Sequence, residues 1–148
     1  INFSNGLAFD RERSRFYCSD TFSTTWTWDV ADDLSLTRQR KLLDKTDADG
    51  LALYADGSVL VTGFRSPGFI TCVSPDGVEL APLPTPPGST TQIRFGGSDA
   101  MDYYINIVPA DGGDSLKDGK PLSGGSYLYR GRSAKPGVLV QPADFVLR

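Results

Sequence analysis

The stretch NGLAFDRERSRFYCSDTFSTTWTWDV, residues 5–30, recurs in altered form as DGLALYADGSVLVTGFRSPGFITCVSPDG, residues 49–77, which is a period of 44 residues. Each copy contains an Asn-Gly or Asp-Gly dipeptide, a short apolar segment, a polar turn, and two further apolar segments separated by a loop. A weaker third copy, TQIRFGGSDAMDYYINIV, covers residues 91–108 and is followed by SGGSYLYRG at residues 123–131. A period of about 40–50 residues with several short strands per unit is typical of β-propeller blades.

The apolar segments have the composition of β-strands, because β-branched and aromatic residues predominate in them and Gly, Asp and Pro bound them. The strands predicted on this basis are residues 15–18, 59–62, 69–73, 103–108 and 127–129. Residues 34–44, LSLTRQRKLLD, are compatible with a short amphipathic helix, but their place in the repeat favours the outer fourth strand of a blade.

We therefore predict an all-β chain that forms about three four-stranded blades of a propeller. The blades are expected at approximately residues 1–44, 45–88 and 89–148, within one partial propeller domain that covers residues 1–148. A β-sandwich with coincidentally similar hairpins is the alternative. The polar segment 110–122 is an insertion that either lies over the mouth of the channel or forms a surface loop.

The composition of the chain excludes several kinds of site. The 148 residues include no histidine and only two cysteines, so Ser-His-Asp and Cys-His mechanisms and Cys/His zinc sites are excluded. Cys18 and Cys72 lie in apolar strand patterns, which favours buried thiols over a disulfide.

The charge and hydropathy of the chain limit its partners and its location. The formal net charge is −3 and no basic stripe is present, which gives no reason to expect nucleic acid. No stretch approaches the roughly 20 apolar residues that cross a bilayer, so we expect no membrane partner and a cytoplasmic location. The first residue is Ile1 rather than Met, and we expect a processed or partial chain.

Ordered motifs along the chain resemble a known family. The motifs are Asn5–Phe9 with Phe16–Asp20, then Asp49–Leu53 with Asp56-Gly57 and Val59–Val61, then Phe95–Asp99 with Tyr103–Ile105, and finally Gly124–Tyr129 with Lys135–Gly137. In this order they resemble the C-terminal half of the SMP-30/gluconolactonase/luciferin-regenerating-like lactonases, with the last motif similar to Drp35-type members. A departure is Thr90-Thr91-Gln92, where the family usually shows an opening with His-Pro-Thr or Gln-Pro-Thr.

The resemblance implies a six-bladed propeller with one divalent cation at the mouth of its central channel. It implies that Asn5 and Asp49 are two of the four metal ligands, and that Asp49 is also the general base in metal-dependent lactone hydrolysis. The other two ligands, a Glu and a second Asn, belong to blades that this chain lacks. Ca²⁺ is the expected cation, with Zn²⁺, Mn²⁺ or Mg²⁺ as alternatives, and a small-molecule lactone is the expected substrate.

The residues themselves support part of this interpretation. Asn5 and Asp49 hold the same position in successive repeats, so in a propeller they would converge on the central axis. An amide oxygen and a carboxylate are hard donors that suit Ca²⁺, Mg²⁺ or Mn²⁺. The competing interpretation is that Asn-Gly and Asp-Gly are ordinary turn signals before strands.

Three blades cannot close a ring, because the open ends leave blade faces and strand edges unpaired. The missing half is therefore expected on another polypeptide, or in a second copy of this chain that forms a head-to-tail homodimer. Two other functions remain open: a non-catalytic propeller module that binds cations or proteins, and a relative of strictosidine synthase or paraoxonase with other substrates.

Overall fold

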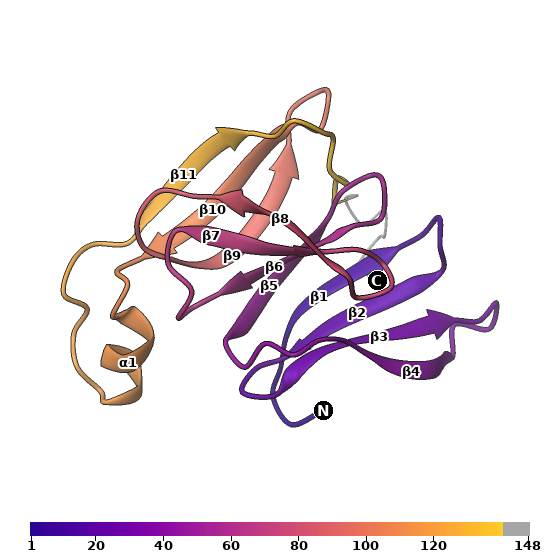
Figure 1. Ribbon diagram of the computed structural model, residues 1–148, viewed down its shortest axis with the longest axis horizontal. Helices are drawn as coiled ribbons and strands as arrows, with labels where there is room; N and C mark the ends of the chain where they lie inside the picture. The colour runs from indigo at the N-terminus through magenta and orange to yellow at the C-terminus, as the bar shows by residue number, and fades with distance from the viewer. Residues whose placement is uncertain (141–148) are drawn as a thin grey trace, which may run out of the picture.

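The computed structural model describes residues 1–140, which form three antiparallel sheets in chain order (Figure 1). The first sheet contains β1 (Ser4–Asp10), β2 (Arg15–Asp20), β3 (Thr24–Val30) and β4 (Leu36–Leu43). The second contains β5 (Ala48–Leu53), β6 (Val59–Gly63), β7 (Phe69–Val73) and β8 (Glu79–Pro84). The third contains β9 (Ser89–Gly96), β10 (Asp102–Val108) and β11 (Tyr127–Arg132). Strands adjacent in sequence pair within each sheet, as in the blades of a propeller.

The strands predicted from composition are confirmed. Residues 34–44 form an outer strand rather than a helix, since β4 covers most of them. The third sheet differs from the expected four strands, because it contains three within the described part of the chain. After β11 the chain turns back to the second sheet: Gly137 forms a bridge with Tyr54, and the Val138 amide donates to the Leu53 carbonyl at 2.8 Å. The expected third unit also included residues 141–148, which lie outside the described residues.

The core lies in two layers on either side of the second sheet (Figure 1). Alternate residues of a strand point to opposite faces, so Val59 and Val61 of β6 pack toward the first sheet and Leu60 packs toward the third. All five residues of β6 are buried as a result. This explains the nearly uninterrupted apolar run at 59–61, which is expected of a strand covered on both faces.

The free face of the first sheet carries apolar side chains that the described residues leave exposed. Leu7 and Phe9 of β1 are 53% and 48% exposed, whereas their repeat equivalents Leu51 and Leu53 in β5 are 2% and 3% exposed. The difference arises because β5 is covered by the first sheet. A groove of about 1100 Å³ borders Leu7 and Phe9 and extends to Phe95 and the segment 137–140.

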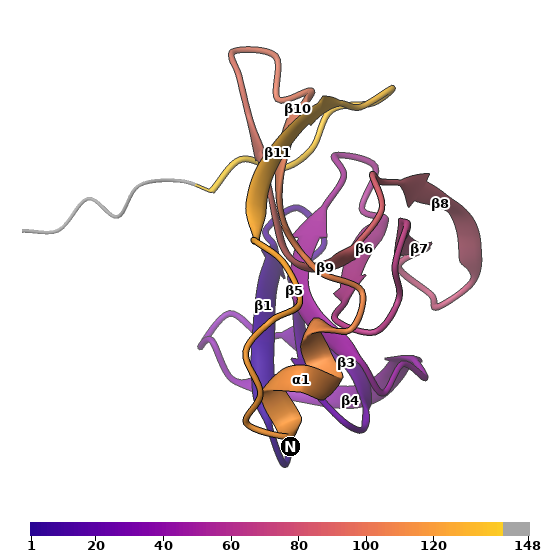
Figure 2. The same cartoon turned by 90° about the vertical axis from the view of Figure 1, so that its left-hand side faces the viewer.

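A short helix, α1 (Gly112–Lys117), lies in the predicted insertion and projects beyond the sheets (Figure 1), so that it lies in front of the strands in the view of Figure 2. No helix among residues 1–140 combines the length and hydropathy needed to cross a membrane. Cys18 and Cys72 are both buried free thiols, 1% and 3% exposed.

Candidate functional site

The first strands of the three sheets, β1, β5 and β9, approach one another closely. A Cβ built on Gly6 would lie 2.2 Å from the Asp49 carbonyl oxygen, and one built on Gly50 would lie 2.8 Å from the Thr91 carbonyl oxygen. Asn5, Asp49 and Thr91 therefore occupy equivalent positions in successive sheets. The glycines that follow Asn5 and Asp49 are required by this approach, since any side chain would separate the strands.

Each of these three positions lies in a β-bulge. The register of β1 with β2 shifts between Ser4 and Leu7, and that of β5 with β6 shifts between Ala48 and Leu51. In β9 the shift falls at Thr91, because Gln92 and Thr90 pair with consecutive residues of β10. A bulge bends its strand and re-aims the side chain of the unpaired residue. The same kind of bulge therefore occurs in β1, β5 and β9, at the same end of the three sheets.

The structure brings Asn5 and Asp49 together. The Asn5 side chain lies close enough to the Asp49 carboxyl to lower its pKa, and Asn5 Nδ2 donates to Thr21 Oγ1 at 3.3 Å. Thr21 Oγ1 in turn donates to the Ala48 carbonyl at 2.7 Å. These contacts engage the nitrogen of the Asn5 amide and leave Oδ1 as an oxygen donor. The juxtaposition predicted from the repeat is present, and the roles of the two residues as ligands and of Asp49 as a base stay predictions.

Asp49 has a perturbed acidity. It is partly buried, and burial raises the pKa of its carboxyl from 3.8 to about 6, while the neighbouring Asn5 amide opposes this change and the nearby Asp47 carboxylate adds to it. A general base works best when its pKa lies near the working pH. A carboxyl with a pKa of about 6 is closer to this condition than an exposed aspartate.

A second carboxylate, Asp47, was missed by the sequence analysis. It accepts hydrogen bonds from Lys45 Nζ at 2.8 Å, Ser66 Oγ at 2.6 Å and the Arg65 amide at 3.0 Å. Burial alone would raise the pKa of Asp47, but the bonds from Lys45 and Ser66 lower it below its ordinary value. Asp47 therefore stays ionised and ties the start of β5 to the loop after β6. The spacing of two Asp residues around Ala48 is the only sequence signal for this cluster.

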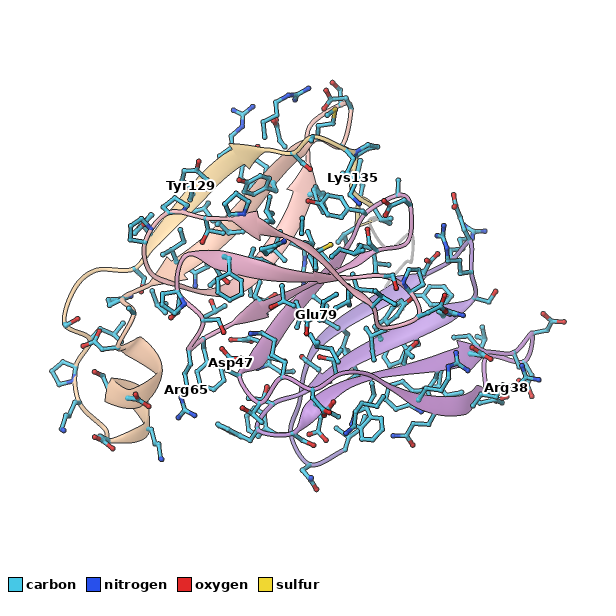
Figure 3. The ribbon with its side chains drawn as sticks, viewed as in Figure 1. Arg38, Asp47, Arg65, Glu79, Tyr129 and Lys135 are labelled. Atoms are coloured by element: carbon cyan, nitrogen blue, oxygen red, sulfur yellow. The ribbon has the colours of Figure 1, made fainter. Side chains whose placement is uncertain are left out.

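Aromatic side chains and α1 border the same end of the sheets. Phe22 packs edge-on against both Phe3 and Phe64, with ring centroids 5.9 Å apart in each pair. Arg65 lies over the Phe64 ring and forms an ion pair with Asp114 of α1 at 3.3 Å. Figure 3 shows Asp47 and Arg65 at the end of the molecule that carries α1, with Lys135 at the opposite end. The insertion thus lies beside the Asn5–Asp49 end of the sheets.

The donor set at this end suits a hard divalent cation only in part. Asn5 and Asp49 supply an amide oxygen and a carboxylate, which Ca²⁺ and Mg²⁺ prefer. Residues 1–140 contain no group of three His, Cys, Asp or Glu side chains arranged to hold a metal ion. Because Ca²⁺ takes about 6–8 oxygen ligands, these two residues would form one part of a larger coordination shell.

The sequence of the chain matches a known family. The family model described as the SMP-30/Gluconolactonase/LRE-like region matches residues 1–108. The chain belongs to this family. Among relatives of known function, a pentonolactonase of Haloferax volcanii is 25% identical over 130 residues, which cover 84% of this chain and 44% of the relative.

Solved structures show the same propeller-type fold as this SMP-30/gluconolactonase-family chain. A luciferin-regenerating enzyme superposes with a TM-score of 0.71 at 24% identity, covering 96% of this chain and 50% of that protein. Regucalcin of Agrobacterium tumefaciens, described as a calcium-binding protein, gives a TM-score of 0.64 at 18% identity and covers 92% and 49%. The chain thus spans about half the length of the relatives that it matches.

Proposed function

We propose that this chain is part of a metal-dependent lactone hydrolase in which Asn5 and Asp49 bind the cation and Asp49 acts as the general base. The observation that carries the proposal is the adjacent Asn5–Asp49 pair, placed by two equivalent bulges where the first strands converge. Family membership supports lactone chemistry, and the pentonolactonase among the relatives favours small sugar lactones as substrates. The calcium-binding description of the regucalcin favours Ca²⁺ as the cation.

The chain's own residues would act on water and on the substrate. Asp49, with its raised pKa, accepts a proton from the water that attacks the lactone carbonyl. Asn5, held by Thr21, lies beside the Asp49 carboxylate, where its Oδ1 would bind the cation. Asp47, held ionised by Lys45 and Ser66, anchors the segment that leads into Asp49. When bound, a divalent cation supplies Lewis-acid polarisation of the lactone carbonyl.

We further propose that three more sheets complete a six-bladed ring, of which this chain forms the C-terminal half. Leu7 and Phe9 on the free face of the first sheet match Leu51 and Leu53, which are buried by a neighbouring sheet. The same pattern on the free face favours another sheet stacked there. The missing sheets would come either from further polypeptide or from a second copy of this chain, and light scattering of the purified protein distinguishes these assemblies by mass.

Removal of divalent cations is expected to abolish lactone hydrolysis. The measurement is the rate of acid release from five- and six-membered sugar lactones, with and without EDTA. Re-addition of Ca²⁺, Mn²⁺ or Mg²⁺ should restore the rate, because the Asn5 and Asp49 oxygens alone do not polarise a carbonyl. A folded protein that binds the cation and hydrolyses none of these lactones would favour the non-catalytic module instead. Hydrolysis that is insensitive to EDTA would contradict the proposed role of the metal.

The pH dependence of cation binding, measured by calorimetric titration at a series of pH values, should report the acidity of Asp49. The cation binds the carboxylate form, and the pKa of Asp49 in the metal-free protein is raised to about 6, so the cation affinity is expected to fall as the pH is lowered through about 6. Replacing Asn5 by alanine removes a contact that lowers this pKa, and should move the midpoint to higher pH. An affinity that falls only near pH 4, typical of exposed aspartate, would show that burial does not perturb Asp49.

A further inference from the structure

Ser19 of β2 lies between the two bulges that carry Asn5 and Asp49. Its side chain is completely buried. Ser19 Oγ accepts a hydrogen bond from the Gly6 amide at 2.7 Å and donates one to the Asp49 carbonyl at 2.5 Å. One hydroxyl group therefore joins the bulge of the first sheet to the bulge of the second.

Among residues 1–140, Ser19 Oγ is the one side-chain group that hydrogen-bonds the Gly6 amide or the Asp49 carbonyl. The two strands that it joins are closely packed, since a Cβ added to Gly6 would contact the Asp49 carbonyl, the Gly50 carbonyl carbon and the Leu51 amide, all within 2.9 Å. Removing the hydroxyl would leave the Gly6 amide and the Asp49 carbonyl without this partner, and buried backbone groups are rarely left so.

The same arrangement recurs one sheet further along. Thr62 of β6 occupies the position equivalent to Ser19 and is also completely buried. Its hydroxyl lies 3.1 Å from the Gly50 carbonyl and 3.0 Å from the Thr91 carbonyl. A buried hydroxyl on the second strand thus links the bulge of its own sheet to the bulge of the next sheet. Ser19 is the copy of this arrangement that acts on Asp49.

We propose that Ser19 is a positioning residue that sets the geometry of Asn5 relative to Asp49, and hence the affinity of the site for a divalent cation. The inference rests on the proposed function, because it assumes that these two side chains bind the cation. Ser19 contacts the backbone rather than the candidate ligand atoms. Its effect would be transmitted by the two bulges, which aim the Asn5 and Asp49 side chains.

The test is calorimetric titration of the purified protein with Ca²⁺, Mn²⁺ and Mg²⁺, with thermal unfolding followed in parallel. Ser19→Ala is expected to weaken cation binding by about 10-fold or more, the lower end of the range for residues that orient metal ligands. Ser19→Thr should bind the cation within about threefold of the unsubstituted protein, because the equivalent Thr62 shows that this position accommodates threonine with its hydroxyl retained.

Ser58→Ala is the matched control. Ser58 is also a buried serine, 2% exposed, but its Oγ contacts Asp56 and Lys135 beside the other end of β6. Both alanine variants remove a buried hydroxyl and should lower the melting temperature, so stability alone does not separate them. Only Ser19→Ala is expected to weaken cation binding.

Equal cation affinity in folded Ser19→Ala and Ser58→Ala would overturn the role of Ser19 and leave the proposed function intact. If Ser19→Ala does not fold, Ser19→Cys carries the test. It keeps a side chain of similar shape with a weaker donor, and binding as tight as that of the unsubstituted protein would again overturn the proposal. Failure of the unsubstituted protein, assembled with the sheets that complete the ring, to bind any of the three cations would overturn the proposed function, and the inference with it.

Discussion

Replacement of Asp49 by asparagine is expected to lower the rate of lactone hydrolysis by about 10²–10⁴-fold, the range for loss of a general base. Asparagine preserves the size of the side chain but removes its charge and its ability to accept a proton at neutral pH. The same change should weaken cation binding, because a carboxylate ligand becomes a neutral amide. The measurements are kcat/KM on sugar lactones and calorimetric cation titration.

Asp76→Asn is the control for this prediction. Asp76 also stands before a glycine, but it lies in an exposed turn with its side chain 82% exposed, near Arg15. The pair of variants separates an Asp-Gly turn from an Asp-Gly bulge at the converging strands. A hydrolysis rate of Asp49→Asn within about threefold of the Asp76→Asn rate would support the interpretation of Asp49-Gly50 as a structural turn only. Loss of a general base lowers the rate by far more than threefold.

Replacement of Gly6 by alanine is expected to lower the stability of the fold strongly, because the added methyl group has no room between β1 and β5. The added Cβ would lie 2.2 Å from the Asp49 carbonyl oxygen and 2.8 Å from the Leu51 amide nitrogen. Both atoms belong to the backbone, so no rotamer change relieves the clash, and β1 must move away from β5. Overpacking of this kind costs about 3 kcal/mol, equivalent to a fall in melting temperature on the order of 10 °C for a chain of this length.

Gly125→Ala provides the comparison, because a Cβ at Gly125 has no heavy atom within 4 Å. Its melting temperature in circular dichroism should match that of the unsubstituted protein. Gly6→Ala should also weaken cation binding, because Gly6 joins Asn5 to the Ser19 hydrogen bond. Equal melting temperatures for the two variants would contradict the close approach of the first and second sheets.

The predictions that succeeded rest on local strand and turn patterns and on the 44-residue repeat. β-branched and aromatic segments between turn signals located the strands, because strand and turn preferences act over a few residues. The assignment of residues 34–44 to a strand depended on the repeat rather than on their own composition, which suits a helix equally well. The equivalence of Asn5 and Asp49 also came from the repeat, and the structure brings these two residues together.

The features that were missed depend on residues distant in the chain. Asp47 could not be recognised from the sequence, because two of its hydrogen-bond partners, Ser66 Oγ and the Arg65 amide, lie in the loop after β6. Ser19 resembles any small residue in a strand, and its position between two bulges exists only once two sheets are stacked. The return of the chain to the second sheet after β11 was also missed, because the bridge of Gly137 with Tyr54 joins residues far apart in the sequence.

The amino-acid order alone was thus sufficient for the repeat, the strands, the all-β class and the equivalence of Asn5 and Asp49, because the 44-residue period and the strand and turn residues can be read directly from the sequence. Packing of one sheet on the next established the raised pKa of Asp49 and the bridge made by Ser19, and folding of the second sheet established the ionised state of Asp47. These properties depend on burial and on hydrogen bonds within and between sheets, and neither exists until segments some 20 to 30 residues apart come into contact.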